Sequence, residues 1–195
     1  PGFDAAALKG VLDRLAAFRP DTITIEAVSG EECDLAARQP AKYGPDYCAS
    51  TDAARAATGL DIPAALAEVD KILKSWPAQP TPAQRRRLAA LFLAANDRAS
   101  ALAQWLQLPT DARQPGDGLD AALVRLLGEV ASRNNENYLI ASRLAARLGL
   151  LRVYAVDNHT GDNVVDNRKA FGEALGAAWA QGRALTREQF LAEAE

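Results

Sequence analysis

The sequence predicts a helix-rich α/β fold built around a small parallel sheet. Short β-branched segments predict strands at Thr22–Glu26 and Arg152–Val156, and helical patterns fill most of the chain between them. Parallel strands need a long crossover connection, so this order of elements is typical of a parallel sheet. We expect a single α/β domain over residues 1–195, in which helices surround the two strands and residues 60–148 form a helical insertion.

The elements before residue 80 begin with a helix. Asp4 is a suitable N-cap for it, and its apolar positions recur at helical spacing until Pro20 prevents continuation. The strand Thr22–Glu26 follows directly. Residues 31–59 are rich in turn-forming residues and predict a loop excursion with two brief helices. A cap followed by an amphipathic pattern predicts the next helix over residues 61–76.

The elements after residue 80 begin with a strong helix start. Thr81–Gln84 combines a capping box with proline at the first helical position, and predicts a helix that continues to Leu108. A longer helical pattern covers residues 120–148, but Asn134 and Asn137 interrupt its apolar stripe. Buried amides without partners cost about 1–3 kcal/mol each, so either the helix breaks there or the amides line a polar cavity.

The C-terminal part of the chain begins with the strand Arg152–Val156. An Ala-rich helical pattern follows from Val164 through Trp179. We expect a turn at Gly182 and then a further helix capped by Thr186.

Composition limits the function classes. The chain has 49% hydrophobic and 24% charged residues, as an ordinary soluble globular protein has. Its net charge is −3 and its one basic run is residues 85–87, so we expect neither a nucleic-acid partner nor an anionic membrane surface. No apolar run is long enough to span a membrane. The sequence lacks methionine even at position 1, so we expect upstream residues to have been removed or cropped, and the C-terminal end to be open to cropping too.

Cys33 and Cys48 are the two cysteines, fifteen positions apart across a loop. A disulfide between them would stabilise the fold by about 3 kcal/mol in the loop-entropy model, and would indicate a periplasmic or secreted protein. The alternative is two free thiols in a cytoplasmic protein. A zinc site is not expected, because no second Cys or His pair accompanies them.

An acidic residue lies at the C-terminal end of each predicted strand. Glu26 ends the first, and Asp157 follows the second, close to His159 and Asp162; His159 is the only histidine. Ligands of open parallel sheets collect at the carboxyl ends of the strands, so these side chains predict a cleft that holds a divalent metal or divides acid and base roles. The alternatives are structural: Glu26 caps a helix or pairs with an arginine, the aspartates shape turns, and His159 is a hydrogen-bonded loop residue.

Polar residues of the interrupted helix extend this hypothesis. We expect Glu136 to join the acidic cleft, Arg133 and Asn135 to orient an anionic or carbonyl-bearing group, and Tyr138 to pack against the ligand. The structural alternative for Glu136 is a helical ion pair with Arg133 or Arg143.

Several of these segments together resemble a known superfamily. The segments are Phe18–Asp21, Thr22–Glu26, Asn135–Tyr138, Ser142–Ala145 and Arg152–Asp157. Together they resemble an uncharacterised bacterial branch of the TraB, erythromycin esterase, ChaN and Tiki superfamily, and the likeness covers most of residues 5–162.

The resemblance implies an α/β fold whose second strand ends in the glutamate matched by Glu26. The superfamily's opening and closing Gly-x-x-His strands have no counterpart in these residues, and Arg133–Asn134 is a candidate for its Arg-Asn element. Superfamily activities include metal-dependent peptide cleavage, macrolide ester hydrolysis and haem binding. We therefore expect a hydrolase-like domain acting on an ester or peptide, with Glu26 as base and a divalent metal as its candidate cofactor. The alternative is a non-catalytic module that binds a small molecule or cofactor, and the oligomeric state stays open.

Overall fold

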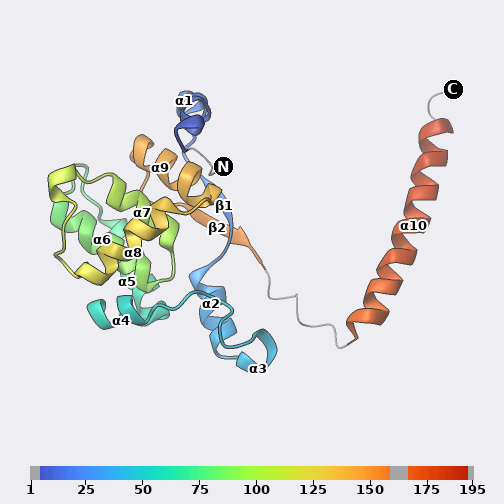
Figure 1. Ribbon diagram of the computed structural model, residues 1–195, viewed down its shortest axis with the longest axis horizontal. Coiled ribbons are helices and arrows are strands. Elements are labelled where there is room, and N and C mark those ends of the chain that lie inside the picture. The colour runs from blue at the N-terminus through green and yellow to red at the C-terminus, as the bar shows by residue number, and fades with distance from the viewer. Residues whose placement is uncertain (1–4, 159–166, 193–195) are drawn as a thin grey trace. The chain divides into compact units, whose positions relative to one another are not determined.

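The computed structural model describes residues 5–158 and 167–192, which belong to two compact units divided after residue 159 (Figure 1). Each unit is described by itself. The expectation of a single domain stays a prediction. No helix among the described residues is long and apolar enough to cross a membrane.

The first unit holds the sheet and most of the helices. In chain order its elements are η1 (Ala5–Leu8), α1 (Lys9–Phe18), β1 (Thr24–Val28), α2 (Gly30–Ala37), α3 (Pro40–Tyr43), α4 (Asp52–Thr58), α5 (Ile62–Lys74), α6 (Pro82–Ala94), α7 (Arg98–Leu106), η2 (Thr110–Ala112), α8 (Ala121–Ser132), the π-helix η3 (Asn137–Ser142), α9 (Arg143–Leu148) and β2 (Tyr154–Asp157). The described part of the second unit is helix α10 (Arg168–Ala192).

The predicted fold class is confirmed, because β1 and β2 pair in parallel within a helix-rich chain. Ile25 lies opposite Ala155 and Val28 lies opposite Asp157, with an irregularity in the register between them. Both strands begin two residues later than predicted. Glu26 therefore lies in the middle of β1 and does not end it.

Small side chains let helices approach one face of the sheet closely. Ile25 and Val153 on the sheet side pack against alanines of α7, η3 and α9, namely Ala99, Ala103, Ala141 and Ala145. Thr24, Glu26 and Val156 are exposed, as the alternation of strand side chains requires.

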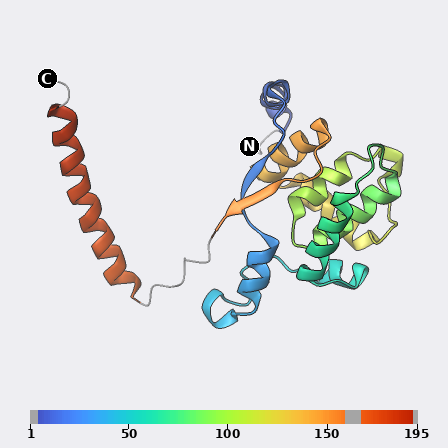
Figure 2. The same ribbon diagram turned by 180° about the vertical axis from the view of Figure 1, so that it is seen from behind.

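The main core surrounds helix α6. No residue from Leu88 to Ala95 is more than 3% exposed, so the second half of this helix is apolar on all its sides. It packs against α4, α5 and α7, whose positions around it can be followed in the two opposite views of Figures 1 and 2. Leu123 and Leu127 of α8 complete the same core.

A row of polar side chains on α7 fixes the segment that leads into β2. The Ser100 hydroxyl accepts a hydrogen bond from the amide of Val153 at 2.9 Å and donates to its carbonyl at 3.1 Å. Gln104 donates to the carbonyl of Leu151 at 2.7 Å. Ser100 and Gln104 are fully buried and lie one helical turn apart, so they replace a neighbouring strand as hydrogen-bonding partners of this backbone.

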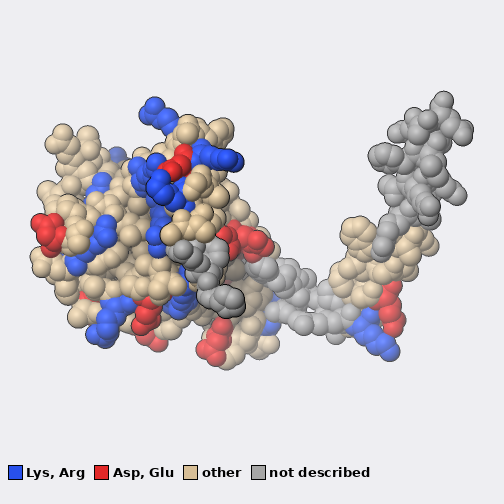
Figure 3. All heavy atoms as spheres, turned by 45° about the horizontal axis from the view of Figure 1, so that its top comes forward, with Lys and Arg blue, Asp and Glu red and all other residues tan. Residues whose placement is uncertain are grey.

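Helix α1 docks on α9 through charged groups. Asp13 accepts hydrogen bonds from Lys9 at 2.8 Å and from Arg147 at 2.6 Å, and these bonds lower the pKa of its carboxyl. Figure 3, which brings the α1 end forward, shows basic side chains gathered there with acidic ones among them. All three side chains are well exposed, so these pairs orient the helix more than they stabilise it.

The predicted helix that continues from Thr81 to Leu108 is wrong in its middle. It is two helices, α6 and α7, separated by residues 95–97. Asn96 adopts a left-handed conformation with φ 61°, and the Asp97 side chain caps α7 by accepting from the amide of Ser100. Asparagine tolerates that conformation and aspartate is a preferred cap, so this pair ends one helix and begins the next.

Other helices also begin, end or break at positions that can be compared with the predictions. The excursion over 31–59 contains α2, α3 and α4, where two helices were expected, and α2 begins with a capping box of Ser29 and Glu32. The interrupted pattern over 120–148 does break, with α8 ending at Ser132 and a π-helix following. The turn expected at Gly182, with Thr186 capping a new helix, is wrong, since α10 is continuous there. One glycine inside a helix costs about 1 kcal/mol, which its alanine-rich neighbours offset.

Candidate functional site

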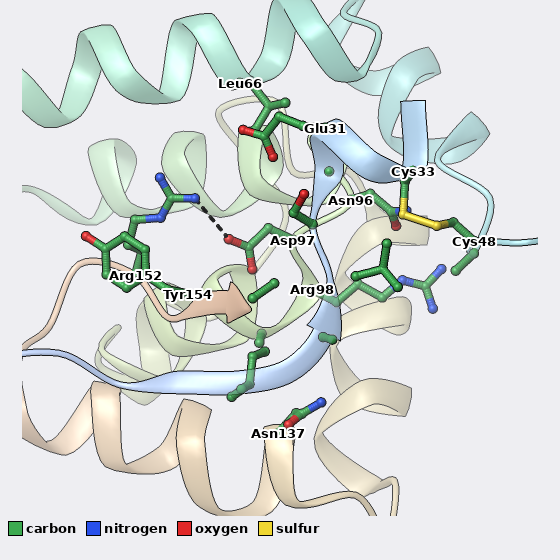
Figure 4. Close-up of a pocket in the computed structure, with 18 of the residues that line it drawn as sticks. Glu31, Cys33, Cys48, Leu66, Asn96, Asp97, Arg98, Asn137, Arg152 and Tyr154 are labelled. Carbon is green, nitrogen blue, oxygen red and sulfur yellow. Dashed lines mark ion pairs between the residues drawn. A yellow bond between two sulfur atoms is a disulfide. The ribbon is translucent and has the colours of Figure 1, made fainter. Parts of the chain in front are cut away.

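A cavity of about 500 Å³ lies where β1 ends and several helices begin (Figure 4). Its walls come from the end of β1 and the start of α2, from the Tyr47–Ala49 segment, from the α6–α7 junction, from the start of η3, and from Arg152 and the start of β2. It therefore opens at the carboxyl end of β1, where ligands of α/β proteins collect. We call it the junction cavity.

Asp97 stands at the α6–α7 junction and faces the cavity. One of its oxygens accepts from the Ser100 amide at 2.9 Å, and the other lies 3.8 Å from a guanidinium nitrogen of Arg152. The side chain is only 16% exposed. Burial raises the pKa of Asp97, and the nearby Glu31 carboxylate adds to the rise, against the hydrogen bonds from Ser100 and the charge of Arg152.

Arg152 is held in place by carboxylates and an aromatic ring. Its guanidinium lies 3.8 Å from Asp70 and 3.8 Å from Asp97, and stacks 4.9 Å from the ring centroid of Tyr154. In Figure 4 its side chain points toward Asp97, and the dashed line marks this ion pair. Its buried Nε has no hydrogen-bond partner. Arg152 therefore compensates Asp97.

Two further arginines, Arg98 and Arg133, line the cavity together. Arg98 follows Asp97 at the start of α7, and its guanidinium donates to the carbonyl of Ser50 at 3.3 Å. In Figure 4 its side chain extends toward the disulfide, away from the carboxylate of Asp97. Arg133 ends α8 and is exposed. Burial lowers the pKa of Arg98, and the like charge of Arg133 adds to that lowering, against the attraction of Tyr138 and Glu129.

The opposite wall consists of α2 and a disulfide. Gly30 begins α2 so close to the end of α6 that an added Cβ would collide with the carbonyl of Ala95. Cys33 of α2 forms a disulfide with Cys48, which confirms the paired alternative for the two cysteines. The bridge ties the Tyr47–Ala49 segment to α2, and Cys33, Tyr47 and Cys48 all line the cavity.

The start of η3 is fixed by asparagines. The Asn135 side chain accepts from the amide of Asn137 at 3.0 Å, and the Asn137 side chain donates to the carbonyl of Glu26 at 3.2 Å. Asn137 and Tyr138 line the cavity. Both alternatives offered for the interrupted helix therefore hold here: the helix breaks, and an amide, that of Asn137, lines a polar cavity.

The structure brings some of the predicted site residues to this cavity. Arg133 and Tyr138 line it. Asn135 does not line it, and acts through the hydrogen bond that positions Asn137.

The expected acidic residues lie elsewhere. Glu26 and Glu136 are exposed and do not line the cavity, and Asp157 is half-buried at the end of β2, also outside its lining. His159 and Asp162 lie outside the described residues. Within the described part of the chain, no group of three His, Cys, Asp or Glu side chains could hold a metal ion. The divalent metal stays a prediction for which these residues offer no site.

Sequence reasoning missed the charged residues nearest to the cavity, namely Glu31, Asp97, Arg98 and Arg152. The sequence does carry a signal for Asp97 and Arg98. Asn96 is a residue type that ends helices, Asp97 is a preferred N-cap, and ligands often bind at helix starts. Glu31 and Arg152 carry no comparable local signal, because only the folded chain brings them together.

We compared the chain with protein-family models, curated proteins and solved structures, and none of these comparisons gave a match. The superfamily resemblance of its short motifs therefore stays a prediction.

Proposed function

We propose that the junction cavity binds a small organic anion and that the first unit is a small-molecule binding module. The observation that carries the proposal is that two arginines, Arg98 and Arg133, line the cavity close enough for their charges to interact. Their charges repel each other. Glu129 attracts Arg98 from outside the cavity lining, but within the described residues no carboxylate forms an ion pair with either arginine. Like charges held together in a cleft are costly unless an anion compensates them.

The size and lining of the cavity support a ligand larger than an inorganic ion. A volume of about 500 Å³ is within the range of small-molecule sites. Ile25, Val28 and Leu66 supply apolar surface, and Tyr138 supplies an aromatic ring beside the arginines. A carboxylate or phosphate on an apolar body matches this combination of walls.

Hydrolysis is the activity that the superfamily resemblance implies, and the geometry favours it less. The expected base Glu26 and its expected companion Glu136 are exposed outside the cavity. Hydrolysis stays a prediction that also depends on His159.

The disulfide supports a place of action outside the cytoplasm. Such bonds persist in oxidising compartments and are rare in the cytosol. We infer that the protein works in the periplasm or as a secreted protein, with Cys33–Cys48 holding one wall of its cavity.

Calorimetric titration of the full chain tests the binding proposal. The probes are 3-phenylpropionate, phenyl phosphate and inorganic phosphate. We expect at least one organic probe to bind, and Arg133→Gln to weaken it by about tenfold, which corresponds to one charge-assisted hydrogen bond. Arg125→Gln is the matched control, because Arg125 is exposed on the same helix and does not line the cavity. Binding that Arg133→Gln leaves unchanged, or no binding of any organic probe that carries a carboxylate or phosphate, amino acids included, would overturn the proposal.

A further inference from the structure

The charged side chains of the junction cavity are sorted by sign. Among the groups that line the cavity, Asp97 interacts electrostatically with Glu31 and Arg152, whereas Arg98 interacts with Arg133 and Tyr138. The carboxylate that acts on Arg98, Glu129, does not line the cavity. Figure 4 shows the same division: Glu31 lies above Asp97 on the side of Arg152, and the Arg98 side chain extends away from them. One cavity therefore presents an acidic side and a basic side.

The acidic side has an uncompensated carboxylate. Asp97 is balanced by Arg152, whose guanidinium is itself held between Asp97 and Asp70. Glu31, in the first turn of α2, is exposed, lines the cavity, and has no ion-pair partner among the described residues. Within the cavity lining, one cation, Arg152, therefore faces two carboxylates, Asp97 and Glu31, and this side can accept a further positive group.

The basic side has the opposite excess. Among the described residues, the Arg98 guanidinium donates a hydrogen bond to a backbone carbonyl, that of Ser50, and neither Arg98 nor Arg133 forms an ion pair with a carboxylate. Each of these guanidinium groups is planar and can donate two parallel hydrogen bonds to a carboxylate. The Arg152 guanidinium is not available for this task, because its carboxylate partners already flank it.

We propose that the ligand of the junction cavity is a zwitterion of the α-amino-acid class, with its carboxylate at Arg98 and Arg133 and its ammonium group at Glu31 and Asp97. The inference rests on the proposed function and names its ligand class. A ligand with both charges compensates both sides of the cavity at once, whereas a simple anion leaves Glu31 unpaired and close to its own negative charge. The side chain of the ligand lies against Ile25, Val28 and Leu66.

Matched ligand pairs test this assignment on the unmodified full chain. Each pair is an amino acid and the same molecule without its amino group: L-phenylalanine with 3-phenylpropionate, L-leucine with 4-methylpentanoate, and L-glutamate with glutarate. We expect at least one of these amino acids to bind about tenfold more tightly than its partner, the effect of one charge-assisted hydrogen bond. 2-Phenylethylamine, which lacks the carboxylate, is expected to bind more weakly than L-phenylalanine by a similar factor.

A variant separates the ammonium contact from general binding. Glu31→Gln keeps the size of the side chain and is expected to remove the tenfold preference for the amino acid, while the deaminated acid binds as tightly as before or more tightly. Glu68→Gln is the control, because Glu68 belongs to α5, beside Leu66, and does not line the cavity. It is expected to leave both affinities unchanged. Circular dichroism of both variants checks that α2 and α5 are intact.

The outcomes distinguish the two proposals. Deaminated acids that bind as tightly as all three amino acids would overturn the zwitterion assignment and leave anion binding in place. Amino acids that keep their preference in Glu31→Gln would overturn the assigned ammonium contact. No binding of any probe would overturn the proposed function, and the ligand class with it.

Discussion

The contact between α2 and α6 offers a sharp test of how the cavity is built. A Cβ added to Gly30 would lie closer to the carbonyl oxygen of Ala95 than 3.0 Å, the limit below which real Cβ atoms are essentially never found. The side chain of Ile62 lies 3.5 Å away, within ordinary contact distance. Gly30→Ala is therefore expected to push the start of α2 away from the end of α6.

The expected cost follows from which atoms collide. Overpacking a well-packed contact costs about 1–3 kcal/mol, and because the oxygen of Ala95 is a backbone atom that cannot rotate away, we expect about 3 kcal/mol. With an m-value of about 2 kcal/mol/M, this lowers the urea midpoint of unfolding by about 1.5 M. Since Glu31 and Cys33 belong to the displaced wall, ligand affinity should fall as well.

Urea unfolding followed by tryptophan emission measures the effect, because Trp105 is 9% exposed in the folded unit. Gly128→Ala is the matched control: the same substitution inside α8, at a glycine whose added Cβ meets nothing within 4 Å. There alanine should raise the free energy of unfolding by about 0.5–1 kcal/mol. A Gly30→Ala midpoint equal to or above the wild-type value, with Gly128→Ala behaving as expected, would refute the packing argument.

Three other substitutions test the surroundings of the cavity. Replacing Cys33 and Cys48 together by serine should lower the free energy of unfolding by about 3 kcal/mol through loop entropy, and weaken probe binding; identical urea midpoints with and without the bridge would contradict this. Ser100→Ala leaves the buried amide and carbonyl of Val153 without their side-chain partner and should cost about 1–3 kcal/mol by urea titration, whereas an unchanged midpoint would show that the hydroxyl is dispensable. The third is Asp97→Asn. Because burial raises the pKa of Asp97 above 3.8, the folded state binds this proton more tightly than the unfolded state. The group therefore lowers the free energy of unfolding as pH rises from about 4 through its folded pKa. In Asp97→Asn, urea titrations at a series of pH values from about 4 upward should no longer show this decrease in the free energy of unfolding. A variant whose free energy of unfolding depends on pH as the wild type's does would contradict the assignment to Asp97.

Much of the fold could be predicted because its elements carry local signals. The caps at Asp61, Thr81 and Asp120 begin α5, α6 and α8 as expected, and the two β-branched segments pair in parallel. What the sequence did not show is where paired strands stop. The ends of β1 depend on its partner: the amide of Tyr154 bonds the carbonyl of Ile23, a pairing that no local pattern contains.

The candidate site was predictable only in part, for a related reason. The three asparagines of residues 134–137 indicated the break before η3. The polar residues around that break included Arg133 and Tyr138, which do line the cavity. The expectation for Glu26 assumed that it ends its strand, but β1 continues to Val28 and the alternation of strand side chains places Glu26 on the exposed face. Asp97 was hidden inside an apparently continuous helix. Both errors concern where an element ends. A shift of two residues put Glu26 in the middle of its strand, and a missed break put Asp97 in the middle of a predicted helix when it begins one.

The cavity is assembled from the ends of elements, and this decides which variants are informative. Asp97 and Asn135 bond backbone amides at helix starts, so substitutions there change stability and binding together. The side chains of Glu31 and Arg133 bond no backbone group among the described residues, although both line the cavity. Substituting them therefore changes the charge that a ligand meets without changing what holds the walls. An effect on binding at these two positions, with an unchanged urea midpoint, isolates ligand recognition from folding.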